Sequence, residues 1–376
     1  MNPLKENAKL LAIISIVLII VISYSLFFYL QSTTETNTRN SFFEHQKTLQ
    51  MKSAQALQRI SSDLDSVMAR LRGLAYSSYL QQADLSSDRT KELLQEFYFQ
   101  INKITTANRL FIINKNCVVV MDISPHGQRS FVGTNVSGLN WIREITIAHK
   151  PIFSNGYTGF DGRYRIAISY PIINRETRQY IGVVGFSVPA AQLFEHYGNI
   201  FDIKSQYLAV LDRNSDHLIH PLKSFIGKPL FGNYTQQATG HNNVLNSLIR
   251  TVMDGKSDFA VYNFKNGDRL TTGFPIILDG KPTYFVFVIT PMSIIYSEIN
   301  KVMSTERMEM FSLLFGITAA IVMLVIFLIR WSSILDNEIK RRTKKLKTAN
   351  KQLSLSNEQL KMRDKNPTRI YQCGSS

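Results

Sequence analysis

Two long apolar runs constrain the fold of this chain more than any other feature. The first, Leu10–Leu30, has 21 residues and no charge, and the second, Phe311–Ile329, has 19 residues and no charge. At 1.5 Å per residue, a helix made from either run reaches ~30 Å, which is the thickness of a hydrocarbon core. We therefore predict transmembrane helices at 10–30 and 311–331.

The first run has an alternative reading as a cleaved signal peptide, with Lys5 and Lys9 as its basic start. A signal peptide usually has an apolar core of about 7–15 residues, which is shorter than this run. The residues that follow, Gln31 to Thr34, offer no clear small-x-small cleavage site. The sequence favours an uncleaved anchor.

The positive charge of the chain indicates its orientation in the membrane. The net charge is +15, and residues 330–376 hold 12 Lys and Arg against 4 Asp and Glu. A basic tail of this kind also suits nucleic acid, but beside an apolar run it is more typical of the cytoplasmic flank of a membrane helix. We expect no nucleic-acid partner. We expect residues 1–9 and the C-terminal region in the cytoplasm and residues 31–310 outside it.

The two cysteines, Cys117 and Cys373, then lie on opposite sides of the membrane and cannot pair with each other. Two cysteines also exclude a disulfide scaffold and a site with four cysteine ligands. His217 and His220 are three residues apart on an expected strand and therefore point to opposite faces. We expect neither a metal nor a cofactor.

The extracytoplasmic segment begins with a helical pattern at 35–80, where apolar residues recur every three, four or seven positions. It predicts a long stalk helix that leaves the membrane. Short strands and helices follow in two similar groups, a membrane-distal unit at 80–190 and a membrane-proximal unit at 200–290. The expected fold class is α+β, with a stalk helix, two PAS-like mixed α/β units built on antiparallel sheets, two transmembrane helices and a C-terminal coiled coil. The expected strands are Arg109–Asn114, Cys117–Ile123, Ile152–Asn155, Tyr164–Ile172, Tyr180–Val188, Gln206–Asp212, His217–His220, Asp258–Phe264, Arg269–Ile277 and Thr283–Thr290.

The run NWIREITIAHKPIFSNGYTGFDGRYRIAISYPII, followed by YIGVVGFSV, resembles the double Cache (dCache) sensor domains of bacteria and archaea. In the amino-acid-binding members of that family, an Arg two residues before the Trp takes the ligand carboxylate, an aromatic residue follows the Trp, and an Asp follows the GVVG run. This chain keeps Trp141 but has Leu139, Ile142 and Ser187 at those three positions. The resemblance therefore implies a neutral, weakly polar or aromatic ligand, or a domain that binds nothing.

The residues that could line a ligand pocket lie in and around this run. Each also fits a purely structural role in the core, in a turn or in a strand. Catalysis outside the cell is a further alternative, but the chain has no recognisable nucleophile–base set and we expect no enzyme. The candidate ligand-binding residues are Trp141, Tyr157, Arg143, Asp161, Tyr170 and Ser187.

The region 332–365 carries a heptad seam, with spacings of four and three between Leu335 and Leu360. This pattern predicts a parallel, dimeric signalling helix, and its sequence resembles the helix that precedes the phosphoacceptor module of sensor histidine kinases. The last histidine is His241, so the expected cytoplasmic region has no phosphoacceptor. Residues 366–376 fit neither the heptad nor a domain, and one allowed coding of this aberrant tail, read one base later, resembles the approach to that phosphoacceptor.

We therefore expect the sensor half of an interrupted two-component histidine kinase, which senses a small extracytoplasmic ligand and forms a homodimer. The alternative is a non-catalytic membrane anchor whose coiled coil heterodimerises with intact histidine kinases.

Overall fold

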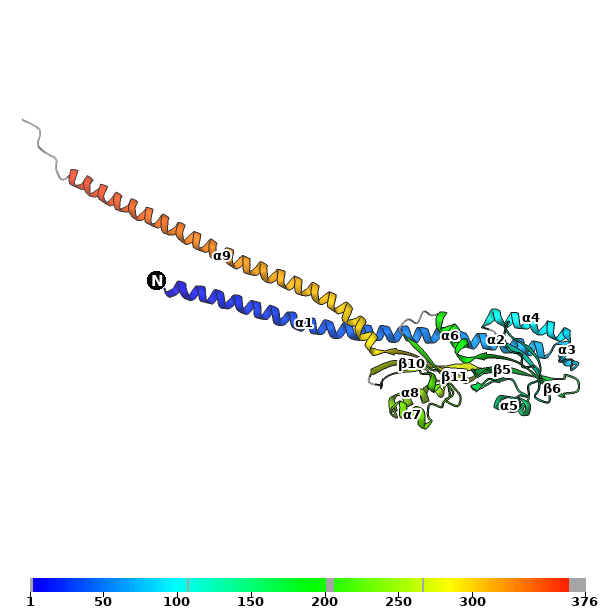
Figure 1. Cartoon of the computed structure of the whole chain (residues 1–376). Coiled ribbons are helices and arrows are strands. Elements are labelled where there is room, and N and C mark those ends of the chain that lie inside the picture. Colours follow the sequence, from blue (N-terminus) through cyan, green and yellow to red (C-terminus); the bar gives the residue numbers. More distant parts are fainter. Residues whose placement is uncertain (1–2, 107, 201–205, 266, 365–376) are drawn as a thin grey trace, which may run out of the picture. The chain divides into compact units, whose positions relative to one another are not determined.

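A computed structural model describes residues 3–106, 108–200, 206–265 and 267–364 (Figure 1). The chain divides into two compact units. One unit holds residues 33–301, and the other combines residues 1–32 with residues 302–376. The expected tail at 366–376, with Cys373, lies outside the described residues.

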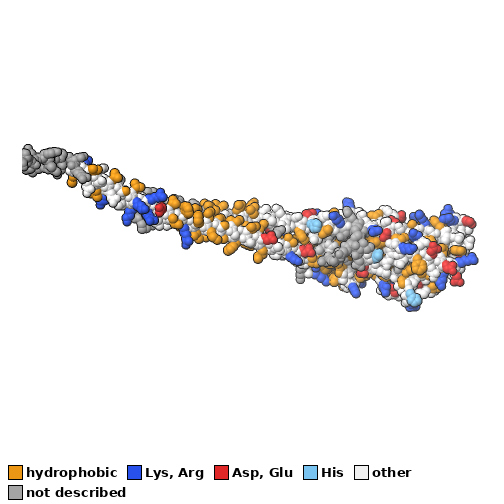
Figure 2. All heavy atoms as spheres, turned by 90° about the horizontal axis from the view of Figure 1, so that it is seen from above, with side chains coloured by type: hydrophobic (Ala, Val, Ile, Leu, Met, Phe, Trp, Pro, Cys, Tyr) orange, Lys and Arg blue, Asp and Glu red, His pale blue; other side chains and the backbone are white. Residues whose placement is uncertain are grey.

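Two helices carry the apolar runs: α1 (Pro3–Leu57) and α9 (Met292–Asp364). Both are long and apolar enough to cross a membrane. The side chains of these runs are exposed in the chain alone, for example Leu18 (59% exposed) and Leu324 (58%). Figure 2 shows the hydrophobic side chains gathered along this part of the helices. Together with the domain between them, the two helices are consistent with a membrane protein.

The unit 33–301 contains two antiparallel sheets, as the fold class predicted. The first sheet has the order β2-β1-β6-β5-β3, with β4 paired to β5. We call residues 59–200 the first subdomain. Its strands are β1 (Arg109–Asn114), β2 (Val119–Ile123), β3 (Ile152–Phe153), β4 (Tyr157–Thr158), β5 (Tyr164–Ile173) and β6 (Tyr180–Pro189), and its helices are α2 (Arg59–Ala75), α3 (Ser78–Gln81), α4 (Asp88–Ile104), α5 (Asn140–Ala148) and α6 (Ala190–Ile200).

The second sheet has the order β8-β7-β11-β10-β9 and so repeats the arrangement of the first. We call residues 206–291 the second subdomain. Its strands are β7 (Tyr207–Asp212), β8 (His217–Ile219), β9 (Asp258–Phe264), β10 (Gly267–Leu278) and β11 (Lys281–Pro291), and its helices are η1 (Lys223–Phe225), α7 (Asn233–Ala238) and α8 (Asn243–Met253).

The helix predicted at 35–80 is divided in the structure. Helix α1 ends at Leu57, Gln58 keeps right-handed helical dihedrals (φ −61°, ψ −18°), and α2 continues to Ala75. The apolar residues of α2 that recur every three or four positions are buried, among them Ile60, Leu64 and Leu71. This apolar stripe packs α2 against strands of both sheets, β5 and β6 in the first and β10 in the second.

Each sheet therefore has two faces with different neighbours. Alternate residues of the central strands point to the helices and belong to the largest buried cluster, for example Leu110, Phe186 and Val286. The residues between them form two smaller clusters on the opposite faces, one around Phe111 and Trp141 and the other around Phe287. A cavity lies on the opposite face of each sheet.

Hydrogen bonds join the two subdomains. The Asp212 carboxylate accepts from the Gly156 backbone N–H at 2.8 Å, and the Tyr284 hydroxyl donates to the Ser154 carbonyl at 2.8 Å. Arg213 donates to the Phe153 carbonyl at 2.9 Å. These bonds tie the loop after β3 to strands β7 and β11.

Candidate functional site

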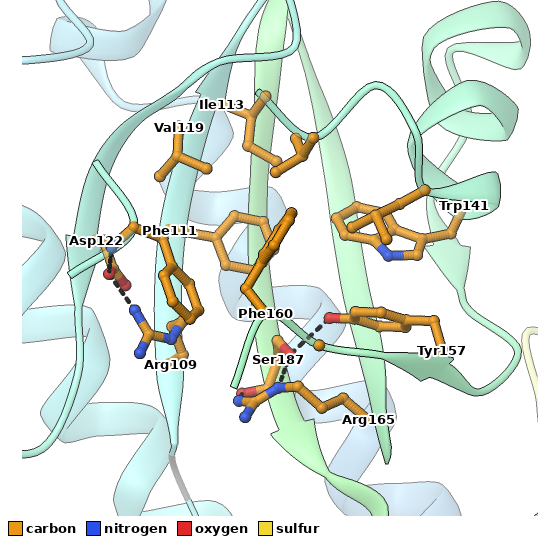
Figure 3. A pocket seen from close by; sticks show the side chains of 14 residues that line it. Arg109, Phe111, Ile113, Val119, Asp122, Trp141, Tyr157, Phe160, Arg165 and Ser187 are labelled. Carbon is orange, nitrogen blue, oxygen red and sulfur yellow. Dashed lines mark hydrogen bonds and ion pairs between the residues drawn. The ribbon is translucent and has the colours of Figure 1, made fainter. Parts of the chain in front are cut away.

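A small cavity of about 40 Å³ lies on the face of the first sheet that is turned away from α2 and α4 (Figure 3). This volume is enough for a few water molecules and is closed to larger compounds without a movement of its walls. Its lining comes from β1, β2, β4, β5, β6, α5 and two loops. The lining residues are Arg109, Phe111, Ile113, Val119, Asp122, Phe131, Val136, Leu139, Trp141, Tyr157, Gly159, Phe160, Arg165 and Ser187.

Strand alternation places these side chains on one face. Arg109, Phe111 and Ile113 are every second residue of β1, and Arg109 stands opposite Ser187 in the pairing of β1 with β6. Gly185 of β6 stands opposite Phe111, and a Cβ atom at this position would come within 2.5 Å of the Phe111 ring. The absence of a side chain at Gly185 therefore lets Phe111 lie flat against the sheet.

Aromatic side chains form the walls of the cavity. Trp141 is 5% exposed, and its ring centroid lies 5.9 Å from that of Phe111 and 5.9 Å from that of Tyr157. Phe131 and Phe160 come from two loops and meet edge to face at 5.6 Å. Because Phe160 is 53% exposed, this pair borders both the cavity and solvent.

The floor of the cavity carries charges that are paired within the chain. Arg109 forms an ion pair with Asp122, whose carboxylate also accepts from the Phe131 backbone N–H at 2.8 Å. Both groups lose hydration on burial, which raises the pKa of Asp122 and lowers that of Arg109. The ion pair between them offsets part of this loss. The Arg109 guanidinium also lies 3.9 Å from the Phe131 ring centroid.

Arg165 is the second cation of the floor, and it is 2% exposed. It donates to Ser187 Oγ at 2.9 Å and to Asp161 Oδ2 at 2.7 Å, and it also bonds Asn108. The Tyr157 hydroxyl shares a hydrogen bond of 2.8 Å with Ser187 Oγ. Burial raises the pKa of the Tyr157 hydroxyl, which therefore stays protonated.

Three buried polar atoms of the lining residues have no hydrogen-bond partner among the described residues. They are the Trp141 indole Nε1, the Arg109 Nε and the Asp122 Oδ1. Buried polar groups in folded proteins almost always have a partner, so two donors and one acceptor at one cavity call for an explanation.

The structure brings three of the six candidate residues to this cavity, namely Trp141, Tyr157 and Ser187. Asp161 stands just behind the lining, where it holds Arg165.

Two candidates lie elsewhere. Arg143 is two residues after Trp141 on the helix, so it points about 200° away from Trp141 and is exposed. It donates to the Ser137 carbonyl at 3.1 Å. Tyr170 has the opposite parity to Arg165 on β5, so it lies on the helical face of the sheet. There its hydroxyl is 3.2 Å from that of Tyr76.

Arg109, Asp122 and Arg165 were not singled out from the sequence. A usable signal was present for Arg165, which is the only charged residue in the otherwise apolar run of β5. A charge at a buried strand position needs a partner or a ligand. Arg109 gave a weaker signal, since it stands at the first residue of its strand.

Residues 59–188 match the family model described as "HK/GC/Chemotaxis protein-like, sensor domain". This range contains every residue that lines the cavity. The matched range covers α2 to β6, which is most of the first subdomain. The match agrees with the resemblance to extracytoplasmic sensor domains that the sequence showed.

The chain is also similar, in part, to solved structures of ligand-binding receptors and their domains. An extracellular ligand-binding receptor from Desulfohalobium retbaense is 19% identical, with a TM-score of 0.49 over 64% of this chain and 39% of that one. The ligand-binding domain of the Pseudomonas aeruginosa amino acid chemoreceptor PctB, in complex with L-Arg, is 14% identical, with a TM-score of 0.49 over 70% and 92%. That of the Pseudomonas fluorescens chemoreceptor CtaA, in complex with L-serine, is 13% identical, with a TM-score of 0.49 over 68% and 99%. A comparison with curated proteins found no match.

Proposed function

We propose that this chain is a two-pass membrane receptor whose first subdomain binds a small molecule in the cavity beside Trp141. The observation that carries this proposal is the set of unpartnered buried atoms at that cavity, within a segment that matches a sensor family. The ligand accepts hydrogen bonds from Trp141 Nε1 and Arg109 Nε and donates one to Asp122 Oδ1. The chain acts by binding and not by catalysis.

The charges of the floor favour a ligand with no net charge. Arg109 is matched by Asp122, and Arg165 is matched by Asp161. An added anion or cation would therefore enter a buried site without a free counter-charge, which is costly. The ligand is small and either uncharged or zwitterionic. A compound larger than the present cavity enters by displacing Phe131 and Phe160, which both come from loops.

A ligand-binding screen with a matched pair of variants tests this proposal, because the chain has two tryptophans, Trp141 and Trp331. The full chain in lipid nanodiscs is screened by thermal shift against small neutral and zwitterionic metabolites. In Trp141→Phe, which removes the indole N–H and keeps an aromatic ring, the stabilisation by a hit falls. In Trp331→Phe it is unchanged, because Trp331 lies outside the sensor unit. Equal stabilisation of both variants contradicts the site.

The proposed orientation places both termini in the cytoplasm, as the positive charge after α9's apolar run supports. Alkaline phosphatase is active only outside the cytoplasm. A fusion after Asn300 is expected to be active and a fusion after Lys351 inactive. The reverse pattern contradicts the orientation.

We further propose that α9 carries the signal into a parallel coiled coil at 332–364. The apolar residues of the heptad seam are exposed in the single chain, for example Leu346 (68%) and Leu353 (64%), so they need a second helix to cover them. In a variant with Cys117 and Cys373 replaced by Ser, Leu346→Cys is expected to cross-link two copies, whereas Thr348→Cys, on the opposite side of the helix, is not. Cross-linking of Leu346→Cys to an intact histidine kinase supports the alternative anchor function.

A further inference from the structure

The second subdomain contains a larger cavity, of about 290 Å³, on the face of its sheet that carries Phe287. Helix α8 covers this face, and Leu245 and Ile249 of α8 line the cavity together with Phe287 and Ile289 of β11. Most of the lining is apolar or aromatic. This composition and volume approach those of small-molecule sites, which are mostly apolar with a few placed polar groups.

The register of the two sheets makes Arg269 the counterpart of Arg165. Arg165 on β5 pairs with Pro189, the last residue of β6, and Arg269 on β10 pairs with Pro291, the last residue of β11. The pairings of β1 with β6 and of β7 with β11 are also equivalent. Arg109 stands opposite Ser187 in the first sheet and Tyr207 stands opposite Ile289 in the second, each two residues before the proline.

The two arginines differ in their charge partners. Arg165 is neutralised by Asp161, as described above. Arg269 donates to the Tyr207 hydroxyl at 3.1 Å and to the Asp268 carbonyl at 3.1 Å, and neither acceptor is charged. The Asp268 carboxylate instead accepts from the Asn263 side chain. No ion pair of Arg269 with a carboxylate occurs within the described part of the chain.

The whole cavity has the same excess of positive charge. Its lining includes Lys265 and Arg269 and, among the described residues, neither an Asp nor a Glu. The Lys265 ammonium lies 5.7 Å from the centroid of the Phe264 ring, which also lines the cavity. Two cations beside an apolar hollow attract an anion with an apolar body.

Two neutral side chains of the cavity wall, His220 and Tyr262, have hydrogen-bond donors that can orient a ligand. His220 Nδ1 accepts from the Leu222 backbone N–H at 3.0 Å, so the proton of its neutral ring is on Nε2, a donor. Burial lowers the pKa of His220 to about 4 and keeps the ring neutral at pH 7. Its ring stacks on Phe225 at 4.5 Å. Tyr262, 7% exposed, accepts from Thr271 at 3.2 Å and keeps its own proton for a further bond.

We propose that the second subdomain holds a separate binding site for an aromatic carboxylate, whose carboxylate meets Arg269 and Lys265 and whose ring lies among Phe225, Phe287 and α8. A guanidinium is suited to a carboxylate because it can donate two parallel hydrogen bonds. Aromatic rings and aliphatic side chains favour a flat apolar body. This site is independent of the ligand proposed for the first subdomain.

Equilibrium dialysis of radiolabelled benzoate, phenylacetate and cinnamate against the full chain in nanodiscs tests the proposal. At least one of the three binds, and its neutral amide binds at least ~10-fold more weakly, since a hydrogen bond to a charged group contributes ~1.5–3 kcal/mol. Arg269→Met weakens binding of the acid by ~10-fold or more. The control Lys281→Met removes an exposed cation of the same subdomain outside the cavity and leaves binding unchanged.

Two further variants separate this site from the first one. Trp141→Ala leaves binding of the acid unchanged, whereas Ala209→Phe, which fills the hollow, abolishes binding of the acid; a thermal melt of each variant shows that it is folded. Failure of all three acids to bind overturns the proposal. So does equal affinity for acid and amide, or equal binding by Arg269→Met and Lys281→Met. Loss of binding in Trp141→Ala moves the acid to the first cavity and also overturns it.

Discussion

The bond between Tyr284 and Ser154 offers a sharp test of how firmly the two subdomains are joined. Tyr284 and Ser154 are both 0% exposed, and the hydroxyl donates to the carbonyl at 2.8 Å. Tyr284→Phe keeps the ring, which packs edge to face on Phe194 at 5.9 Å, and removes only the donor. The loss of a buried partner costs about 2 kcal/mol. For a unit of this size, Tm then falls by ~4–8 °C.

The assay is thermal unfolding of the full chain in detergent, followed by near-ultraviolet circular dichroism. The matched control is Tyr234→Phe, because Tyr234 belongs to the second subdomain and is 52% exposed. Its hydroxyl contacts water in the folded state as well as in the unfolded state, so its removal leaves Tm within ~1 °C of that of the parent. A Tyr284→Phe variant that melts with the control refutes the reasoning, since the hydroxyl then adds no net stability at the junction.

Three further changes test other buried groups by their effect on Tm. Burial and the nearby charge of Asp212 raise the pKa of Asp216 to about 6, so the folded state binds more protons than the unfolded state between pH 3.8 and about 6. Tm therefore falls as the pH rises through that range. Asp216→Asn makes this fall shallower. Gln50→Met removes a buried amide that bonds residues of β10 and lowers Tm, with a cost of ~1–3 kcal/mol. Asp122→Asn leaves the buried cation of Arg109 without its counter-charge, which lowers the free energy of unfolding by ~3 kcal/mol or more. Tm therefore falls further than in Gln50→Met. An equal or smaller fall contradicts the stabilising role of that ion pair.

The period of apolar residues predicted most of the fold. The expected strands 109–114 and 258–264 coincide with β1 and β9, and the strand expected at 164–172 gains only Ile173. These strands alternate or are continuously apolar, so their side chains alone indicate their conformation. Strand β4, of two residues, and helix α7, of six, were not predicted, because elements so short carry no measurable period.

The candidate site was predictable only in part, because strand parity decides which residues share a face. The family resemblance directed attention to Trp141 and Ser187, which lie in the cavity. Tyr170 belongs to the same strand as Arg165 but points to the other side, and a window of sequence without a fixed register does not separate them. Asp122 comes from β2, and only the sheet order brings it beside Arg109.

Strand β11 ends at Pro291, and α9 begins at the next residue, Met292. A flexible loop at this junction could absorb a movement of the strand by changes in its backbone dihedral angles. Without such slack, the end of β11 and the first turn of α9 move as one piece. Arg269 pairs with Pro291 at this point, so the ligand site proposed around its guanidinium lies beside the first residue of α9. The proposed site and the start of the helix are thereby joined through a single pair of neighbouring residues, with no loop between them.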